Sequence, residues 1–322
     1  MMETNRQKQE MIARACVLYY EYQKSQNTIA RELGISRSYV SQLLTQAKDE
    51  GLVKISVNVD NDFKREIAFT NRFPGLRFTY IMNSDSDAYT AGNIGRFAAP
   101  HITRLINNSE IIGINLGEAV QRVISHLDRT DFSDSSSRFV IQIMGGYNSN
   151  TTINATLPNE VVFSLGRILN CKCLYLNCPA IFKDRRVRNL MLKEQAIKQV
   201  TEYWDKIDLA IMGIGAVDES SKVFPILSQE MKDNLRRLKA CCDITINFFD
   251  RNGNYLELLA DNKISIPFRQ LKKIKTKVVI CSGTHKARAL IAGLRAGMID
   301  VLIIDSITAE AVEKILNGAL KK

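Results

Sequence analysis

Apolar residues recur at spacings of three and four along the first sixty residues, which is the pattern of helices that bury one face. One such stretch begins near Met11, and a second occupies residues 26–44. From about Asn58 the pattern changes to short β-rich runs that alternate with helical stretches. We therefore expect a small helical domain over residues 1–57 and a larger α/β domain over residues 58–322. The first helix is expected to bury Met11, Ile12, Ala15, Cys16, Tyr19 and Tyr20.

Residues 26–44 carry the residue types of a helix-turn-helix at the positions that this motif constrains. Ala30 is small where the second helix crosses close to the first, and Gly34 stands where a left-handed backbone ends the first helix. Ser36 is a good N-cap for the second helix. The alternative is a helical hairpin with a solvated polar face, but the combined placement favours the DNA-binding motif. The inner faces are expected to consist of Ile29, Leu33, Ile35, Val40, Leu43 and Leu44.

Polar side chains are expected to point outward from the first two turns of the second helix, the part that reads base edges in the major groove. Arg37 suits a guanine or a phosphate, and Gln42 suits an adenine. The predicted partner is therefore double-stranded DNA. After the motif, the alternation of Val53, Ile55 and Val57 predicts a strand that leads out of this domain. The predicted DNA-binding residues are Gln26, Thr28, Ser36, Arg37, Ser38, Tyr39, Ser41 and Gln42.

The alternation after residue 58 predicts a doubly wound, mostly parallel, Rossmann-like sheet covered by helices on both faces. One exception is the Asn-Gly turn in Asp250–Asn254, which indicates a hairpin between residues 243–249 and 255–259. Residues 131–137, rich in serine, are expected to form a surface loop. Strands are expected at Ile111–Ile114, Phe139–Met144, Lys172–Leu176, Leu209–Met212, Val278–Cys281 and Val301–Ile304. Helices are expected at Glu118–His126, Asn159–Leu169, Val187–Tyr203, Gln229–Leu238, Lys286–Ala296 and Ala309–Leu316.

Composition narrows the class of protein. The chain is 45% hydrophobic and 24% charged, which excludes bulk disorder. It lacks any run of 18 apolar residues for a membrane helix, and its polar start is unlike a secretory signal. With seven cysteines best explained as reduced thiols, we expect a cytoplasmic protein with no membrane partner. The net charge is +10, but residues 1–60 hold eight Lys/Arg against seven Asp/Glu, so bulk charge is weak evidence for DNA binding.

Glycines cluster where the predicted strands end. Because the carboxyl ends of parallel strands lie at one edge of a sheet, these loops are expected to meet there. Glycine loops and helix N-termini at that edge hold small molecules. One loop of this kind is usually only a tight turn, but several on one edge predict a small-molecule crevice. The loops are Gly113–Gly117, Gly145-Gly146, Gly213–Gly215 and Ser282-Gly283.

Motifs for cofactors, metals and catalysis are missing, so none of the three is expected. Residues 213–218 lack the third glycine of a dinucleotide loop, and no Gly-Lys-Ser/Thr stands in the chain for a P-loop. Cys171, Cys173 and Cys178 have no fourth ligand nearby, which favours apolar cysteines over zinc. The Gly-x-Ser-x-Gly and His-Glu-x-x-His motifs are also absent. His285 either lines the crevice or merely begins a helix.

Several short segments of the second half are distinctive in combination. They are Ile112–Gly117, Ile143–Gly146, Met212–Gly215, Asp243–Gly253, Ile280–Ala289 and Leu294–Asp305. Together with the helix-turn-helix, which alone occurs in many families, they resemble the SorC family of bacterial sugar-responsive transcription regulators. The resemblance runs nearly end to end, from about Lys8 to Leu316.

The resemblance implies an effector domain related to sugar-phosphate isomerases and deaminases, which binds a sugar, polyol or sugar phosphate and controls a catabolic operon. It implies a homo-oligomer, usually a tetramer, and anion-binding loops at the strand ends. Lys286 would be the cationic partner of a phosphate or hydroxyl, and Asp250 the acidic group near the sugar. The implied effector-binding residues are Gly113, Asn115, Gly117, Glu118, Gly145, Gly146, Gly213, Gly215, Asp250, Gly283, His285 and Lys286.

Glu118 departs from the family pattern, in which the first loop usually carries hydroxyl residues. A carboxylate repels a bound phosphate in a dry site. Either the effector is an unphosphorylated sugar or polyol whose hydroxyls Glu118 accepts, or Glu118 points into solvent from the first turn of its helix.

Three functions are compatible with these features. The leading hypothesis is a regulator in which effector binding changes operator affinity, with operator spacing set by the symmetry of a tetramer or dimer of dimers. An isomerase or deaminase with a DNA-binding appendage would need an acid/base pair, for which only Glu118, Asp250 and His285 are available. An effector-free DNA-binding oligomer is the third, and the glycines at the strand ends argue against it.

Overall fold

The computed structural model describes residues 2–53, 62–85, 87–132, 137–147, 158–219, 221 and 223–318. The chain divides into two compact units, Met1–Val59 (unit 1) and Asp60–Lys322 (unit 2). The domain boundary expected between residues 57 and 58 lies outside the described residues. So do Ile55 and Val57 of the expected strand, and residues 133–136 of the expected surface loop.

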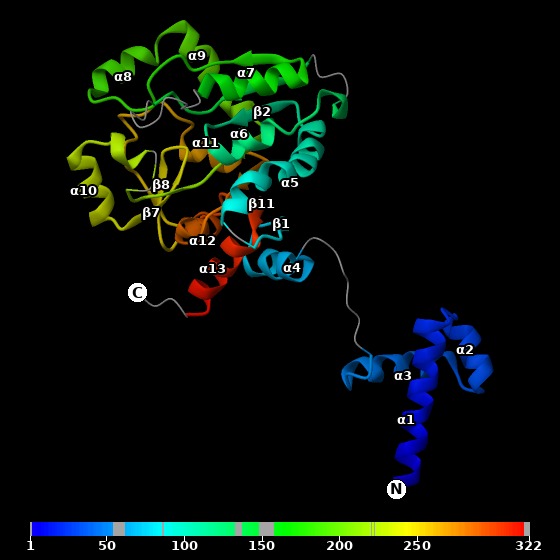
Figure 1. The fold of residues 1–322 in the computed structure, drawn as a ribbon. Coiled ribbons are helices and arrows are strands. Elements are labelled where there is room, and N and C mark those ends of the chain that lie inside the picture. The colour runs from blue at the N-terminus through cyan, green and yellow to red at the C-terminus, as the bar shows by residue number, and fades with distance from the viewer. Residues whose placement is uncertain are drawn as a thin grey trace. The chain divides into compact units, whose positions relative to one another are not determined.

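Three helices form unit 1 (Figure 1). The side chains of Ser25 and Ser36 accept hydrogen bonds from the backbone N–H groups of Thr28 and Tyr39, and so cap the second and third helices. Gly34 has a φ of 68° and ends the second helix in the left-handed conformation. These contacts confirm the expected helix-turn-helix. The helices are α1 (Met2–Cys16), α2 (Gln26–Leu33) and α3 (Arg37–Asp49).

The core of unit 1 follows the predicted apolar faces with one exception. Tyr19 is 36% exposed, although its spacing placed it on the buried face of the first helix. The reason is that α1 continues as a wider π-helical turn over Val17–Glu21, which shifts the phase of the side chains that follow. The buried core residues are Ile12, Ala15, Cys16, Ile29, Ala30, Val40, Leu43, Leu44 and Ala47.

Unit 2 is built on a seven-stranded sheet in which every pair of neighbouring strands is parallel, as the alternating pattern predicts (Figure 1). The strand order is β1-β11-β10-β5-β2-β3-β4. The strands are β1 (Phe78–Met82), β2 (Ile111–Ile114), β3 (Phe139–Gln142), β4 (Lys172–Leu174), β5 (Leu209–Met212), β10 (Thr276–Ile280) and β11 (Val301–Asp305). The predicted α/β fold class is confirmed.

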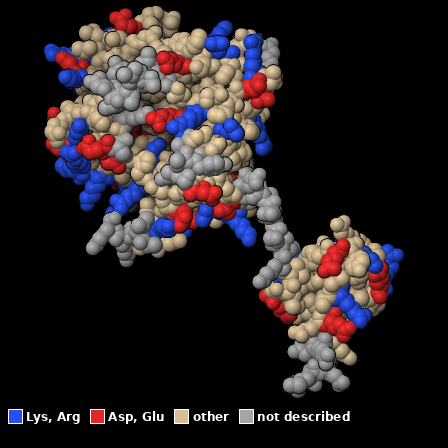
Figure 2. All heavy atoms as spheres, in the orientation of Figure 1, with Lys and Arg blue, Asp and Glu red and all other residues tan. Residues whose placement is uncertain are grey.

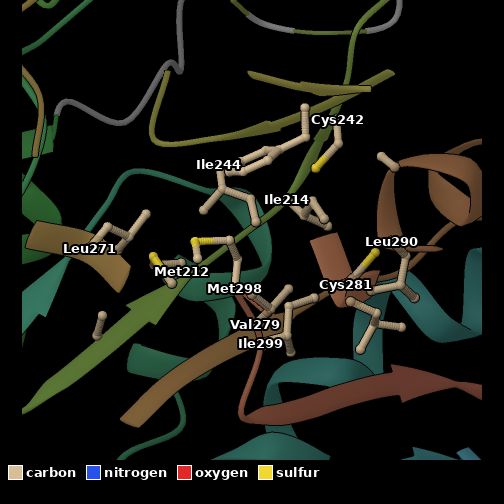
Figure 3. Packing of buried hydrophobic residues seen from close by; sticks show 14 of the residues in the cluster. Met212, Ile214, Cys242, Ile244, Leu271, Val279, Cys281, Leu290, Met298 and Ile299 are labelled. Atoms are coloured by element: carbon tan, nitrogen blue, oxygen red, sulfur yellow. The ribbon is translucent and has the colours of Figure 1, made fainter. Parts of the chain in front are cut away.

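Helices cover both faces of this sheet because successive strand residues point to opposite sides. On β5, Leu209 and Ile211 pack with α5, α6 and α7, whereas Ala210 and Met212 pack with α4, α9, α11, α12 and α13. Figure 3 shows the second of these layers, where Met212, Val279 and Cys281 meet Leu271 and Leu290. The helices are α4 (Phe63–Arg72), α5 (Asp87–Asn107), α6 (Glu118–Ile124), α7 (Pro158–Leu169), α8 (Arg185–Met191), α9 (Gln195–Thr201), α10 (Gln229–Arg237), α11 (Phe268–Lys273), α12 (Ala287–Arg295) and α13 (Ser306–Leu316).

The direction of the chain through the sheet reverses between β2 and β5. From β2 the chain proceeds outward through β3 to β4, and it then returns to β5 and proceeds the other way through β10 to β11. The loops that follow β2 and β5 therefore diverge, which leaves room between them at the carboxyl edge of the sheet.

A smaller antiparallel sheet packs beside the first, and its strands differ from the predicted hairpin. The run at 243–249 was expected to be one strand, but it is divided between β7 and β8 by a tight turn at Thr245 and Ile246, which have φ values of 53° and 58°. Neither residue type is typical of a turn, so the prediction of a single strand at 243–249 was wrong. The hairpin predicted at the Asn-Gly turn is confirmed, because β8 pairs with β9 in antiparallel fashion across it. The strands are β6 (Gly215–Ala216), β7 (Ala240–Ile244), β8 (Asn247–Asp250) and β9 (Tyr255–Leu256).

Two further differences concern helices. The single helix expected at Val187–Tyr203 is two helices, α8 and α9, because the chain turns at Leu192–Glu194. The sequence pattern assigned no element between residues 58 and 110, where the structure has α4, β1 and α5. Among the described residues, none of the helices combines the length and the apolarity needed to cross a membrane.

Candidate DNA-binding surface and effector crevice

The outward surface at the start of α3 carries five of the predicted DNA-binding side chains, all exposed: Ser36, Arg37, Ser38, Ser41 and Gln42. A shallow groove runs along the same side of α3 and continues past Gln42 to Thr45, Gln46 and Asp49. The DNA-binding residues predicted from the sequence end at Gln42. The spacing of three and four residues from Gln42 to Thr45 and Gln46 was the signal that would have extended the surface.

The other three predicted DNA-binding residues are less accessible. Tyr39 is partly buried against the core of unit 1. Gln26 and Thr28 are half-buried at the start of α2, where the hydroxyl of Thr28 lies 2.9 Å from that of Ser25. Thr28 and Tyr39 thus take part in the hydrogen bonds that cap α2 and α3.

Charge is sparse and mixed on this surface. Arg37 is the only cation among the predicted DNA-binding residues, and Lys24, next to α2, forms an ion pair with Glu32 at 2.7 Å. Figure 2 shows basic and acidic side chains interspersed over the visible face of each unit. Since few cations here can neutralise phosphates, the arrangement favours hydrogen bonds from neutral amide and hydroxyl groups.

In unit 2 a crevice of about 320 Å³ opens at the carboxyl ends of β2 and β5, where the direction of the chain reverses. This is the position at which open α/β sheets bind ligands, and the volume suits a small molecule. Glycines of the strand-end loops, Gly117, Gly213 and Gly215, contribute backbone to its wall. Its polar side chains are Asn115, Glu118, Arg122, Tyr147, Ser221, Asp243, Thr245, Ser282, His285 and Lys286.

The floor of the crevice joins the loops after β2 and β5. The side-chain oxygen of Asn115 accepts a hydrogen bond from the backbone N–H of Gly213 at 3.2 Å. A Cβ atom at Gly213 would meet no heavy atom within 4 Å. Because Gly213 lines the crevice, a side chain there would occupy space that is open to a ligand.

The basic wall is the loop from Ser282 to Lys286. The N–H of Gly283 donates to the hydroxyl of Thr308 at 2.8 Å, and that hydroxyl donates to the carboxylate of Asp305 at 2.6 Å. Asp305 and Thr308 are fully buried. Gly283 has a φ of 108°, which favours glycine. Through these contacts the core of unit 2 holds His285 and Lys286 at the crevice.

The opposite wall is acidic. Asp243 is buried, its carboxylate accepts the N–H of Ile246, and its Oδ1 atom has no hydrogen-bond partner among the described residues. Burial raises the pKa of Asp243 to about 7, against smaller lowering effects of the Ile246 N–H and the Lys263 ammonium. Burial also raises the pKa of Tyr147, and the nearby Asp243 and Glu118 carboxylates raise it further. Since buried polar atoms are normally paired, Oδ1 of Asp243 is placed to accept a hydrogen bond from a ligand.

Comparison with known proteins places this architecture in a family. Residues 57–314 match the family model described as "Putative sugar-binding domain", and residues 14–49 match the model described as "Sigma-70, region 4". The sorbitol operon regulator of Klebsiella pneumoniae is 27% identical over 311 residues, which cover 94% of this chain and 98% of that protein. The chain belongs to the SorC family of sugar-binding regulators.

A solved structure and a second relative agree. The crystal structure of the full-length Klebsiella regulator SorC matches 94% of this chain and 97% of its own, with a TM-score of 0.71 and 27% identity. The deoxyribonucleoside regulator of Bacillus subtilis is 26% identical over 314 residues, which cover 96% of this chain and 98% of that protein. The resemblance stated from the sequence motifs is confirmed.

The crevice of this SorC-family chain brings together seven of the twelve implied effector-binding residues: Asn115, Gly117, Glu118, Gly213, Gly215, His285 and Lys286. Glu118 is exposed as well as facing the crevice, so it lies at the rim. The other five are Gly113, Gly145, Gly146, Asp250 and Gly283, and they lie outside the lining.

Packing and hydrogen bonds account for most of those five. A Cβ atom would stand 2.8 Å from Ile143 at Gly113, and 2.7 Å from the carbonyl of Pro179 at Gly145, so both glycines permit close packing. Gly283 shapes the loop that carries Lys286, and Gly146 borders a different hollow. Asp250 accepts the backbone N–H groups of Asn252 and Asn254 at 2.8 and 2.9 Å, which closes the turn before β9.

Five polar crevice residues were not predicted from the sequence: Arg122, Tyr147, Ser221, Asp243 and Thr245. Ser282 was expected at the crevice only as part of a strand-end loop. Asp243 begins one of the motifs that carry the resemblance, but the acidic group implied near the sugar was Asp250, at the other end of that motif. Tyr147 follows Gly145-Gly146 directly, so the sequence already indicated that it lies close to the end of a strand.

A larger hollow of about 1220 Å³ lies between α10 and the segments at 178–183 and 258–262. Its lining is mainly apolar and includes Phe182, Met231 and Leu235. It shares Tyr147 with the smaller crevice, but its lining includes neither Asp243 nor Lys286. Within the described ranges, no group of three or more His, Cys, Asp or Glu side chains is arranged to hold a metal ion.

Proposed function

We propose that this chain regulates transcription of a carbohydrate operon, and that its operator affinity changes when a polyhydroxylated effector occupies the crevice. The observation that carries the proposal is the buried Oδ1 atom of Asp243, which has no hydrogen-bond partner among the described residues and lies in a crevice at the switch point of the sheet. A hydroxyl group is the donor that this atom lacks. The printed names of the relatives, a sorbitol operon regulator and a deoxyribonucleoside regulator, support an effector of this chemistry.

The two walls suggest how such an effector is oriented. Hydroxyl groups would lie against Asp243 and Tyr147, and either a phosphate or a further hydroxyl would lie against Lys286. Glu118 at the rim would accept a hydroxyl from a free sugar or polyol. The proposed effector-binding residues are Asn115, Gly117, Glu118, Gly213, Gly215, Asp243, His285 and Lys286, with Gly113, Gly145, Gly146 and Gly283 in supporting backbone positions.

The proposed DNA contacts lie on α3. Arg37 and Gln42 would address bases, and Ser38 and Ser41 would address phosphates or bases. Gln26, Thr28, Ser36 and Tyr39 would contribute at the helix ends. Because a helix-turn-helix unit reads one half-site, we propose that the protein acts as a homo-oligomer, a tetramer or dimer of dimers, on a palindromic operator in the cytoplasm.

The proposal includes no catalytic step. The enzyme alternative needs an acid/base pair, for which the sequence offers only Glu118, Asp250 and His285. Asp250 is engaged in the turn before β9 and lies outside the crevice lining. The relatives are likewise named as regulators.

Thermal unfolding against free sugars, polyols and their phosphates tests the effector half. A binder at about 100 times its Kd stabilises the folded protein by about 2.7 kcal/mol. A rise in Tm with free polyols assigns Glu118 as a ligand, whereas a rise with phosphates alone assigns Lys286 to a phosphate. A duplex selected from a randomised pool then tests whether the same compound changes DNA affinity. Absence of any response in both assays contradicts the proposal.

A further inference from the structure

The tight turn between β7 and β8 holds two residues in a backbone conformation that their side chains disfavour. Thr245 and Ile246 have φ values of 53° and 58°, in the left-handed region where β-branched residues are rarely found. Two-residue turns of this kind usually contain Asn and Gly. Asp243, just before the turn, and Thr245 within it both line the crevice. Contacts from outside the turn must therefore hold its conformation.

Three buried polar side chains supply these contacts. The ammonium group of Lys263 donates to the carbonyl of Ile246 at 2.6 Å and to Oδ1 of Asn247 at 2.7 Å. The hydroxyl of Ser265 donates to the carbonyl of Thr245. The amide of Asn247 donates to the hydroxyl of Thr245 at 3.0 Å. Lys263, Ser265 and Asn247 are each no more than 4% exposed, so water does not compete for these hydrogen bonds.

The segment that carries Lys263 and Ser265 is itself fixed to the end of β3. The N–H of Gly145 donates to the carbonyl of Ile264 at 3.0 Å, and the N–H of Ile266 donates to the carbonyl of Ile143 at 2.8 Å. Alternate residues of an extended segment point in opposite directions. Ile264 and Ile266 enter the core, while Lys263 and Ser265 reach the turn. Segment 263–266 thus connects the end of β3 in the large sheet to the turn of the hairpin.

We infer that Lys263 is a positioning residue of the effector crevice, which holds the strained turn so that Asp243 and Thr245 stand on the crevice wall. This inference rests on the function proposed above. Lys263 is not in the crevice lining and acts through the turn. The link to Asp243 is direct, because the N–H of Ile246 donates to its carboxylate. A change in the turn therefore changes where that carboxylate points.

The chain offers a matched lysine that lacks this role. Lys277 on β10 is also 4% exposed, and its ammonium group also donates to a backbone carbonyl, that of Ile274, at 3.1 Å. It pairs with Asp300 at 2.7 Å and lies outside the crevice lining. If a buried lysine acted only through general stability, then Lys263→Met and Lys277→Met would have the same effect on the crevice.

The test compares the full-length K263M and K277M variants by two measurements. Amide hydrogen exchange reports the turn at residues 243–247, and calorimetric titration reports affinity for two probes, sorbitol and sorbitol 6-phosphate. We expect K263M to speed exchange in the turn at least tenfold and to weaken binding of the responsive probe at least tenfold. We expect K277M to leave both within twofold of the unchanged protein. Equal effects of the two variants, or unchanged exchange in K263M, overturn the inference.

Ser265→Ala is the second variant, for the case in which K263M does not fold. It removes a single hydrogen bond to Thr245 and is expected to change the same amides and the same affinity, by a smaller factor. Wild-type exchange rates at the turn in S265A contradict the inference. If the unchanged protein binds neither probe, sorbitol and sorbitol 6-phosphate are excluded as effectors, while the exchange data still decide the role of Lys263.

Discussion

The surfaces that unit 1 and unit 2 present to their proposed partners are built in opposite ways. On α3, side chains such as Arg37 and Gln42 are exposed, and the fold beneath depends on other residues. In the crevice, Asp243 and Thr245 are buried and tied into hydrogen-bond networks. Function can therefore be separated from stability in unit 1, whereas in unit 2 a change to the site also changes the free energy of unfolding.

Asp243→Asn is expected to have the largest effect on stability, and in the stabilising direction. Burial raises the pKa of this carboxyl from 3.8 to about 7, so its contribution to stability falls as the pH rises from about 4 to about 7. An uncharged amide of the same shape removes that dependence. At pH 8 the free energy of unfolding of the variant is expected to be higher by up to about 4 kcal/mol. The gain is reduced by the loss of the attraction between the Asp243 carboxylate and the Lys263 ammonium group. Urea unfolding at pH 8 and pH 4 measures the difference, which is expected to vanish at the lower pH.

The same variant is expected to respond more weakly to the effector, because the amide offers one acceptor oxygen where the carboxylate offers two. Asp250→Asn is the control, since that carboxylate accepts hydrogen bonds within an exposed turn outside the crevice. It is expected to lose a little stability and to keep the effector response. An Asp243→Asn protein that is less stable at pH 8 contradicts the account of a buried carboxylate whose Oδ1 atom has no partner among the described residues.

Two glycines of the strand-end loops allow a sharper version of the comparison. At Gly145 a Cβ atom would stand within 2.8 Å of three backbone atoms of residues 178–180, and at Gly213 it would meet none within 4 Å. Gly145→Ala is expected to lower the free energy of unfolding by about 1–3 kcal/mol. Gly213→Ala is expected to leave stability nearly unchanged but to abolish the effector-induced rise in Tm. If Gly145→Ala abolishes the effector-induced rise in Tm and Gly213→Ala keeps it, the effector does not bind in this crevice.

Thr308→Val tests the support of the basic wall. The valine keeps the shape but leaves the buried Asp305 carboxylate without one donor and the Gly283 N–H without its acceptor. We expect a loss of about 1–2 kcal/mol in the free energy of unfolding and a weaker effector response. Thr201→Val is the control, because that hydroxyl donates to Lys198 at an exposed site. Equal losses in the two variants contradict the role assigned to Thr308.

The helix-turn-helix could be predicted almost completely because its signals are local. Ser25 and Ser36 cap the helices, Gly34 provides the left-handed residue between them, and the apolar spacing identifies the core. Tyr19 was placed wrongly because a π-helical turn changes the spacing, and no residue type announces that change.

The position of the crevice could be predicted from the sequence, but most of its polar lining residues could not. The glycines at strand ends identified the correct edge of the sheet, because parallel strands share that edge. The identity of Asp243 and Thr245 depended on a turn formed by Thr245 and Ile246, which have no turn propensity. Lys263, which holds this turn, comes 17 residues after Ile246 and contributes nothing that a local pattern could reveal. Glycines required for packing, such as Gly145, were indistinguishable in sequence from those that line the crevice, such as Gly213.

The smallest expected effect on stability tests the separation of function from fold in unit 1. Gln42→Ala is expected to change the free energy of unfolding by less than about 0.5 kcal/mol, since the side chain is exposed on α3. Its affinity for the selected duplex is expected to fall by about 1–3 kcal/mol, because a bidentate contact to adenine is lost. As the contact is neutral, the slope of log affinity against log salt is expected to stay unchanged, whereas Arg37→Ala lowers that slope by about one if Arg37 binds a phosphate.

Gln9→Ala, the same change on an exposed site of α1, is the control and keeps full affinity. If Gln42→Ala binds DNA as tightly as Gln9→Ala does, the reading surface is not on the first two turns of α3. These residues of α3 then do not form an exposed DNA-reading surface, and the contrast with the buried crevice of unit 2 does not hold for them.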